Sequence, residues 1–332
     1  MKERPTNGQV IIVFTEHPIL GILLIPYIAE KLDDGTLQLV EQAFHASPEA
    51  MSKMSEAERQ AIHIASYYTE KHLMSVYSRE KTVSRFLHKL SEDPERIKND
   101  IRPSIEKKLL EMPGYYTGQT GNSFLFFATK QNPAVKILYA HHAYHINPHN
   151  AEIRVTFHVD NKTFRYQLQC YYEGQPFSLS ELKPVVVLTS APATLLLGME
   201  LYFFPHIESA RILPFTKKRS ISVDASQIEK YIDNIVIPIA RYHEIETHGL
   251  SIMEEKCPCE AILSFEDTTY NGQALQLGFR YGDQTFTSDS ALEMKKIIYR
   301  KTSGEIFFFR RNITAEEQVV QLLTDAGLQQ LN

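Results

Sequence analysis

Two alternating apolar segments on either side of a short polar turn place the strongest constraint on the fold. Every second residue in 153–159 is apolar, Asp160-Asn161 follows as a turn, and residues 164–170 alternate again. Successive side chains of a strand point to opposite faces, so this pattern predicts an antiparallel hairpin with one buried and one solvated face. The strongest short hairpin signal in the chain is a second turn, Asn271-Gly272.

Residues 47–112 have a different pattern, which predicts a block of helices with charged outer faces. Ser55 followed by Glu58 forms a capping box, and apolar residues then recur three and four positions apart. A linker is expected at residues 115–122, which contain Gly and Thr but few apolar residues. The predicted fold class is therefore α+β, with mainly antiparallel β-sheets and a helical insert near the N-terminus.

The length of 332 residues exceeds the usual size of a single hydrophobic core, which favours two or three domains. We assign strands and the helical block to residues 1–118. Residues 119–332 form a β-rich α+β region, with two subdomains as an option. The boundary is expected inside the predicted linker.

Residues 184–242 are the most apolar stretch and predict short strands followed by an amphipathic helix. Asp224, with Gln227 three residues later, indicates the start of that helix, and Pro238 is expected to kink or end it. A last helix is predicted near the C-terminus, where Thr314-Ala-Glu-Glu317 has the sequence of a capping box.

Composition restricts the compartment and the partners. The net charge of -5 argues against a protein whose whole surface contacts nucleic acid, but it is compatible with a local basic patch. Three cysteines cannot form a disulfide framework in a chain of this length, so a reducing cytoplasm is the expected location. No stretch reaches the ~20 apolar residues that span a bilayer, and no membrane partner is expected.

Metal and catalytic chemistry receive little support from the sequence. The histidines of residues 141–149 have no carboxylate or cysteine spaced to complete a ligand set, so we interpret them as strand and turn residues. Cys257-Pro-Cys259 lacks the usual spacing of a zinc pair and has no second pair downstream. No G-x-x-x-x-G-K-[ST] phosphate-binding loop occurs. We therefore expect no catalytic residue, metal or cofactor in this segment.

A basic triplet, Lys217-Lys218-Arg219, is the main candidate for contact with nucleic acid. It follows Pro214-Phe215, and such a cluster can bind phosphates; an exposed turn with three solvated cations is the alternative. Arg310 and Arg311 form a second, weaker candidate. The consecutive aromatic residues at 202–204 and 307–309 either stack on bases or fill both faces of a covered sheet.

Residues 182–328 contain a series of segments in a recognisable order. These are PVVVLTSAPATLLLGMELYFF, LPFTKKRSISV, the helix from Asp224, ALQLGFRYGDQTF and FFFRRNITAEEQVVQLLTDAGL. The order resembles the region that precedes the motor in bacterial SWI/SNF-type (DEAD/DEAH-box-like) helicase ATPases. Relatives are expected to have an Arg-Asp pair where this chain has Arg311-Asn312, and a helix containing Glu follows in both.

The resemblance implies a non-catalytic N-terminal module of a DNA-dependent helicase-like ATPase, which regulates the motor or contacts DNA. The ATP-binding motifs of such proteins lie downstream, so ATP and magnesium are expected in the motor, and no catalytic residue is carried over. DNA and the motor domains are the implied partners. The alternative is a protein-interaction module without nucleic-acid binding; for an independent enzyme the sequence offers no supporting constellation.

Overall fold

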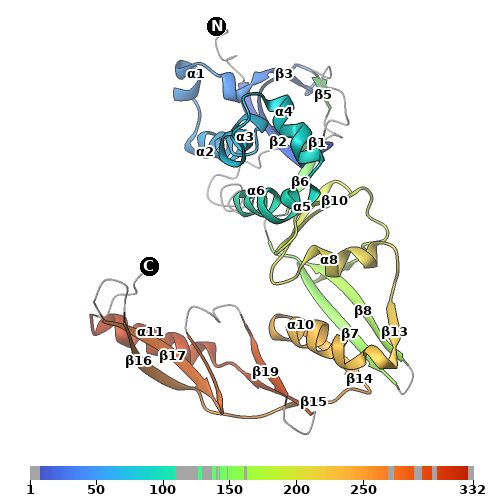
Figure 1. The fold of residues 1–332 in the computed structure, drawn as a ribbon, viewed down its shortest axis with the longest axis vertical. Helices are drawn as coiled ribbons and strands as arrows, with labels where there is room; N and C mark the ends of the chain where they lie inside the picture. Colours follow the sequence, from blue (N-terminus) through green and yellow to red (C-terminus); the bar gives the residue numbers. More distant parts are fainter. Residues whose placement is uncertain are drawn as a thin grey trace. The chain divides into compact units, whose positions relative to one another are not determined.

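The protein has both helices and antiparallel-rich sheets, which confirms the predicted α+β fold class (Figure 1). The structure is a computed structural model. It describes residues 8–109, 126–128, 137–139, 141, 143–147, 149–160, 163–267, 273–287, 294–300 and 305–327. Asn271-Gly272 and the predicted linker at 115–122, with the predicted domain boundary inside it, lie outside the described residues.

The chain divides into two compact units, and it passes between them more than once. The first unit contains residues 1–151 and 172–217, and the second contains residues 152–171 and 218–332. The predicted hairpin at 153–170 therefore belongs to the same unit as the C-terminal part of the chain. Among the described residues, no helix combines the length and the apolar character needed to cross a membrane.

A nine-stranded sheet forms the centre of the first unit, with the strand order β10-β11-β12-β6-β4-β1-β2-β3-β5. Its strands are β1 (Gly8–His17), β2 (Gly21–Lys31), β3 (Leu37–Gln42), β4 (Phe126–Ala128), β5 (Ile137–Leu138), β6 (Ala143–Ile146), β10 (Val185–Thr189), β11 (Ala193–Leu197) and β12 (Glu200–Phe204). Most neighbours are antiparallel, whereas β1–β4 and β12–β6 are parallel. The short strand β9 (Gln175–Phe177) precedes β10 in the chain.

The predicted helical block is present and begins near its predicted start. It comprises α1 (Pro48–Ser52), α2 (Glu56–Ser66), α3 (Glu70–Tyr77), α4 (Val83–Ser91), α5 (Pro94–Arg96) and α6 (Arg102–Leu109). The Ser55–Glu58 capping box at α2 is confirmed: Glu58 N–H donates to Ser55 Oγ at 3.2 Å, and Ser55 N–H donates to Glu58 Oε2 at 2.7 Å.

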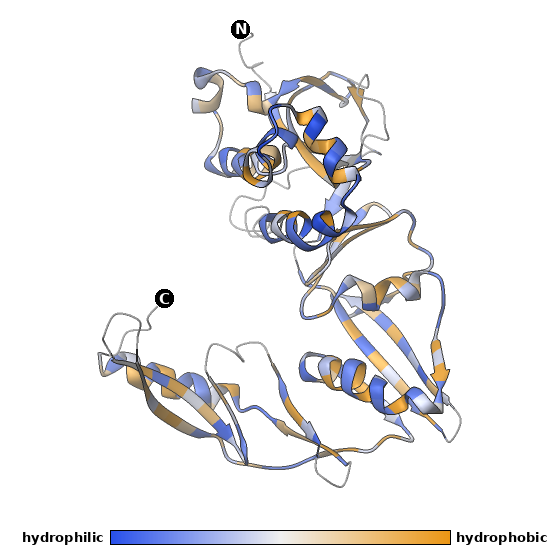
Figure 2. Cartoon of the chain, in the orientation of Figure 1, coloured by the Kyte–Doolittle hydropathy of each residue, from blue (hydrophilic) through white to orange (hydrophobic). Residues whose placement is uncertain are grey.

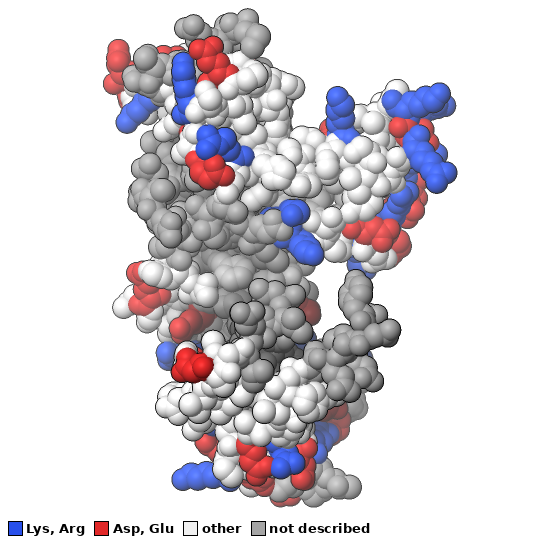
Figure 3. Space-filling model, turned by 90° about the vertical axis from the view of Figure 1, so that its left-hand side faces the viewer, with Lys and Arg blue, Asp and Glu red and all other residues white. Residues whose placement is uncertain are grey.

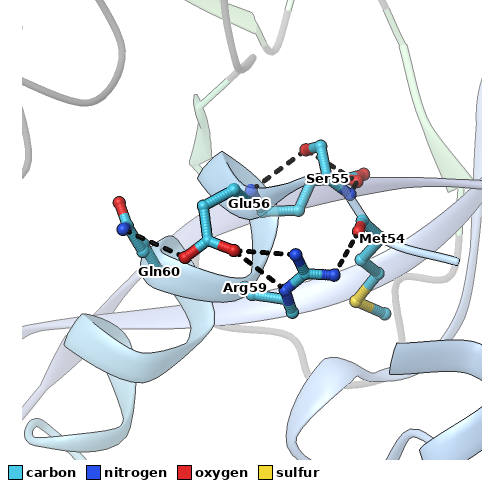
Figure 4. A network of polar contacts seen from close by, with 6 residues as sticks. Met54, Ser55, Glu56, Arg59 and Gln60 are labelled. Carbon is cyan, nitrogen blue, oxygen red and sulfur yellow. Dashed lines mark hydrogen bonds and ion pairs between the residues drawn. The ribbon is translucent and has the colours of Figure 1, made fainter. Parts of the chain in front are cut away.

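The first turn of α2 is reinforced by a surface network (Figure 4). Arg59 donates to Glu56 Oε2 at 2.7 Å and to the Met54 carbonyl oxygen at 2.7 Å, and Gln60 donates to Glu56 Oε1 at 3.1 Å. These contacts lower the pKa of Glu56, mainly through its hydrogen bond with Arg59. Negative charge near a helix N-terminus also interacts favourably with the helix dipole.

The helices pack on the sheet through a large shared core, and Ile62 of α2 forms a smaller cluster with Val10 and Ile28 of the sheet. Buried side chains from β1, α2, α4, α6 and β11 meet in the large core, represented by Ile12, Ile64, Phe86, Ile105 and Leu196. Each fully buried side chain of this size contributes ~1.5–3 kcal/mol of transfer free energy. The helical block is therefore part of the first unit's core and does not stand apart from the sheet (Figure 1).

The second unit begins with the predicted hairpin. Strands β7 (Glu152–Val159) and β8 (Thr163–Tyr172) pair antiparallel, with Ile153 opposite Cys170 and Phe157 opposite Tyr166. Apolar and polar residues alternate along both strands (Figure 2), as the sequence pattern predicts. Strand β13 (Ile221–Asp224) extends the sheet beside β8, and β14 (Glu244–His248) extends it beside β7.

The amphipathic helix of the second unit starts later than predicted. Asp224 is the last residue of β13, and α9 (Ile228–Tyr231) follows a short 3-10 turn. Asp224 accepts a hydrogen bond from Ser226 N–H at 2.9 Å, so its side chain closes the strand-to-helix turn. The ring of Tyr231 then packs against Phe164 of β8, with ring centroids 5.6 Å apart.

Pro238 does not end this helix. The π-helical segment Ile232–Val236 leads into α10 (Ile237–Tyr242), in which Pro238 is the second residue. Pro103 has the same arrangement, because the π-helical segment Ile97–Ile101 leads into α6. Proline cannot donate to the carbonyl four residues earlier, and the wider π turn accommodates the missing donor.

Two small sheets and one helix complete the second unit. Strand β15 (Ile252–Glu254) and the hairpin β19 (Lys296–Arg300)–β20 (Ile306–Arg310) form one sheet; β16 (Glu260–Asp267), β17 (Gln273–Tyr281) and β18 (Gln284–Thr287) form the other. The helix α11 (Ile313–Asp325) follows β20. Its predicted capping box is wrong: Asn312 is the N-cap and accepts from Ala315 N–H at 3.1 Å.

We expect Gly249→Ala to destabilise the second unit. Gly249 has a φ of +75°, and an added Cβ would lie 1.9 Å from the carbonyl oxygen of Val159. The expected loss in the free energy of unfolding is ~3 kcal/mol or more, measured by urea denaturation. Gly327→Ala is the matched control, because Gly327 has a φ of +88° and no atom within 4 Å of an added Cβ. Equal losses in the two variants would contradict the close approach to Val159.

Candidate nucleic-acid interface

The basic triplet, Lys217 to Arg219, directly follows a turn in which the side chain of Phe215 is buried. Helix α8 (Ser209–Ile212) continues into a 3-10 turn, Leu213–Thr216, in which Phe215 is buried. Lys217 N–H donates to the Pro214 carbonyl oxygen at 3.2 Å and closes this turn. The chain then passes through the triplet into β13 (Ile221–Asp224), which pairs with β8. The triplet is thus preceded by the buried Phe215 and followed by a paired strand.

Lys217, Lys218 and Arg219 are all exposed. Within the described parts of the chain, none of the three forms an ion pair. The division between the two units falls inside the triplet, after Lys217. On the face drawn in Figure 3, lysines and arginines lie among aspartates and glutamates, so positive charge on that face is local. An unpaired cation cluster retains its full charge for an anionic partner.

Arg310 is partly neutralised within its own sheet. It lies at the end of β20 (Ile306–Arg310), and its side chain is half exposed. Its Nε donates to Glu254 Oε1 on β15 at 3.4 Å, and its guanidinium lies 5.8 Å from the ring centre of Phe308. An exposed pair of this kind is worth ~0–1 kcal/mol, so Arg310 can exchange Glu254 for another anion at little cost.

Arg311 is placed in the interior of the second unit. Its side chain is 4% exposed, and both Nε and Nη2 donate to the carboxylate of Glu316, with an Nε–Oε1 distance of 3.0 Å. Its Nη1 donates to the Met294 carbonyl oxygen at 2.8 Å. These contacts do not support the predicted nucleic-acid contact by Arg311, because the guanidinium is already bound inside the protein.

The Arg311–Glu316 pair belongs to a buried network that attaches α11 to the sheets. Tyr281 Oη donates to Glu316 Oε1 at 2.8 Å and accepts from Asn312 N–H at 2.7 Å. Burial, followed by its hydrogen bonds to Cys259 and Glu316, raises the pKa of Tyr281 above its ordinary value. This hydroxyl therefore stays protonated and acts as a structural donor. The Arg311-Asn312 motif and the helix that follows thus have a structural explanation.

Two of the three consecutive aromatic residues in each run are core residues, and the middle ones, Phe203 and Phe308, are half-buried. Tyr202 and Phe204 are buried on β12, and Phe307 and Phe309 are buried on β20. Tyr202 packs on Phe177 with ring centroids 4.7 Å apart, and Phe309 packs on Tyr299 at 5.1 Å. These four buried rings are not available to stack on bases and instead fill covered sheet faces.

The histidines and cysteines are the other candidate site residues of the sequence. In the part of the chain that is described, no three His, Cys, Asp or Glu residues lie close enough to hold a metal ion; His142 lies outside it. His149 lies 3.5 Å from Glu173, and His158 stacks on His248 at 4.5 Å. Cys257 Sγ accepts from Gly282 N–H at 2.9 Å, so this cysteine supports a turn.

Glu106 forms a contact that the sequence pattern did not reveal. It accepts from the backbone N–H and the hydroxyl of Ser190, both at 2.8 Å, and from Arg102 Nε at 3.0 Å. The carboxylate joins α6 to the turn between β10 and β11. Its partner is 84 positions away, and periodicity reports only on neighbours within a few residues.

Comparison with known proteins identified one relationship. A family model described as bacterial SNF2 helicase associated matches residues 124–332, which is more than half of the chain. Searches of curated proteins and of solved structures found no match. The matched range includes the basic triplet and the Arg311–Glu316 network, and the helical block lies outside it.

We expect Glu316→Ala to destabilise the second unit strongly, because it leaves the Arg311 guanidinium buried without its counter-ion. Breaking a buried pair in this way costs ~3–5 kcal/mol. The matched control is Glu317→Ala, since Glu317 is the exposed neighbour on the same helix, and its effect should stay within ~0.5 kcal/mol. Urea denaturation of both variants measures the difference. Similar losses in both variants would contradict a structural role for the buried pair.

Proposed function

The chain belongs to the bacterial SNF2 helicase associated family, and from this premise we propose that it is a non-catalytic accessory module of a SNF2-type, DNA-dependent ATPase. In this proposal the linked motor binds ATP and magnesium and performs hydrolysis. The module regulates the motor or contacts the DNA on which the motor acts. Such a role is carried out in the bacterial cytoplasm, where the chromosome lies.

The exposed, unpaired triplet is the observation that supports contact with DNA. Three consecutive exposed cations offer hydrogen-bond donors to backbone phosphates. Phosphate contacts are independent of base sequence, which suits a module that accompanies a translocating motor. Arg310 is the second proposed contact residue, because its exposed pairing with Glu254 is weak.

Arg311 has a different role in this proposal. Its guanidinium holds Glu316 and thereby fixes α11 beside the end of β20. The neighbouring Arg310 is the last residue of β20 and its side chain is exposed. Arg310 is thus a surface residue, and Arg311 is a core residue.

A protein-interaction module without nucleic-acid binding is the alternative function. The net charge of -5 favours it, because a negative chain repels a polyanion outside its local basic patches. The two functions differ in one observable, the salt dependence of binding to duplex DNA.

We expect the 332-residue chain to bind duplex DNA with an affinity that falls steeply with salt. Each phosphate contact contributes a slope of about -0.9 in log K against log salt. Replacing Lys217, Lys218 and Arg219 together by Ala should therefore flatten the slope by ~2.7. Fluorescence anisotropy over a series of salt concentrations measures the slope.

The matched control replaces Arg79, Lys81 and Arg85 by Ala, which removes three exposed cations from the helical block. This variant should retain the slope of the unchanged chain. Absence of binding at low salt, or the same flattening in both triple variants, would contradict DNA contact through the triplet and favour the alternative function.

A further inference from the structure

Strand β16 (Glu260–Asp267) forms one edge of a three-stranded sheet in the order β16-β17-β18. Its pairing with β17 is continuous over the whole strand, from Glu260 opposite Arg280 to Asp267 opposite Gln273, without a register shift. No other strand of the described chain pairs with its outer edge. An edge of this length presents a row of backbone donors and acceptors to which a further strand can pair.

The same strand carries exposed apolar side chains on one face. Phe265 is 73% exposed, Leu263 is 49% exposed, and Leu275, directly opposite Phe265 on β17, is 37% exposed. Residues two apart on a strand and direct cross-strand partners share a face, so the three side chains form a continuous row. Exposed apolar side chains gathered in this way are typical of interaction sites.

Leu263, Phe265 and Leu275 lie on a sheet face whose other end is covered by a helix. Phe279 and Tyr281 lie on the same face of β17 and are buried in a core to which Val319 and Val320 of α11 contribute. The helix therefore covers one end of this sheet face, while Leu263, Phe265 and Leu275 at the other end stay exposed. Figure 2 shows the apolar character of β16 and β17.

The outer edge lacks the features that commonly prevent strand addition. Natural edge strands are often interrupted by a bulge or proline, or carry lysine. Strand β16 has the sequence EAILSFED, with no lysine or proline, and its register is regular. We propose that β16 is a docking edge, to which a strand of a partner protein pairs while its apolar side chains cover Leu263 and Phe265.

Charge determines what kind of strand fits. Glu260 begins β16, and Glu266 and Asp267 end it. Glu260 is paired with Arg280, whose Nε donates to it at 3.0 Å, and the acidic residues Glu266 and Asp267 give the other end of the strand its negative charge. The partner strand therefore alternates apolar residues and carries lysine or arginine at its ends. A nucleic acid does not fit, because phosphates are repelled and the row offers no donors.

A second copy of this chain also fits poorly. Antiparallel pairing of two β16 strands brings Glu260 of one copy to the end that carries Glu266 and Asp267 of the other. Each end of the paired strands then has three acidic residues against the single cation Arg280, and this excess of like charge is destabilising. The occupant is thus a strand of different sequence. This inference does not depend on the triplet, so DNA binding and strand docking can each fail independently.

Two synthetic peptides test the proposal with the 332-residue chain. Both have a core of alternating valine and threonine; one has two lysines at each end, and the other has two glutamates at each end. Anisotropy of the labelled peptides measures affinity, and hydrogen exchange of residues 260–267 reports strand addition. We expect the lysine-flanked peptide to bind and to slow exchange in β16, with the glutamate-flanked peptide at least about tenfold weaker.

Replacing Leu263 and Phe265 together by Lys should weaken binding of the lysine-flanked peptide by about tenfold or more. The matched control replaces Val76 and Met199, which are exposed apolar residues elsewhere, by Lys. Circular dichroism of both variants should match that of the unchanged chain, because all four side chains are exposed. The control should retain binding.

Three results would overturn the proposal. The first is unchanged exchange in residues 260–267 with the lysine-flanked peptide. The second is equal affinity in the Leu263→Lys, Phe265→Lys variant and the control variant. The third is protection of β16 that rises with protein concentration in the absence of peptide, which would identify a second copy as the occupant.

Discussion

Burial of one sheet face under helices is the constraint on which both units depend. In the first unit, Ile12 of β1 meets Phe86 of α4 in a core that also includes α6. In the second, the ring of Tyr231 covers Phe164 of β8, and α11 covers Phe279 of β17. An amphipathic sheet is not stable until its apolar face is covered. The exposed turns and strand edges lie where no helix covers the sheet.

The elements that periodicity predicts correctly are those whose interactions are local. The β7–β8 hairpin and the Ser55–Glu58 capping box depend on residues a few positions apart, and both are confirmed. Asn312 replaces the predicted cap of α11 because the helix starts where Arg311 is held by Glu316. A pair such as Glu106 and Ser190, which are 84 positions apart, leaves no local signal in the sequence. The triplet is visible in the sequence as three consecutive basic residues, whereas the burial of Arg311 can be seen only in the folded structure.

The chain separates its charged and apolar surface features. The cations of Lys217 to Arg219 lie on a turn before β13, whereas Phe265 and Leu263 lie on the edge strand β16 between acidic ends. The first suits a polyanion, and the second suits a protein strand with basic flanks. In the two proposals, the triplet contacts DNA and β16 contacts a strand of a partner protein.

DNA-stimulated ATP hydrolysis by the linked SNF2-type motor, measured with and without this module, tests the accessory role most directly. The chain alone should hydrolyse no ATP, because its sequence contains no phosphate-binding loop. Its addition should change the rate of the motor in the presence of DNA. Hydrolysis by the isolated chain, or a motor rate that is the same with and without it, would contradict the account.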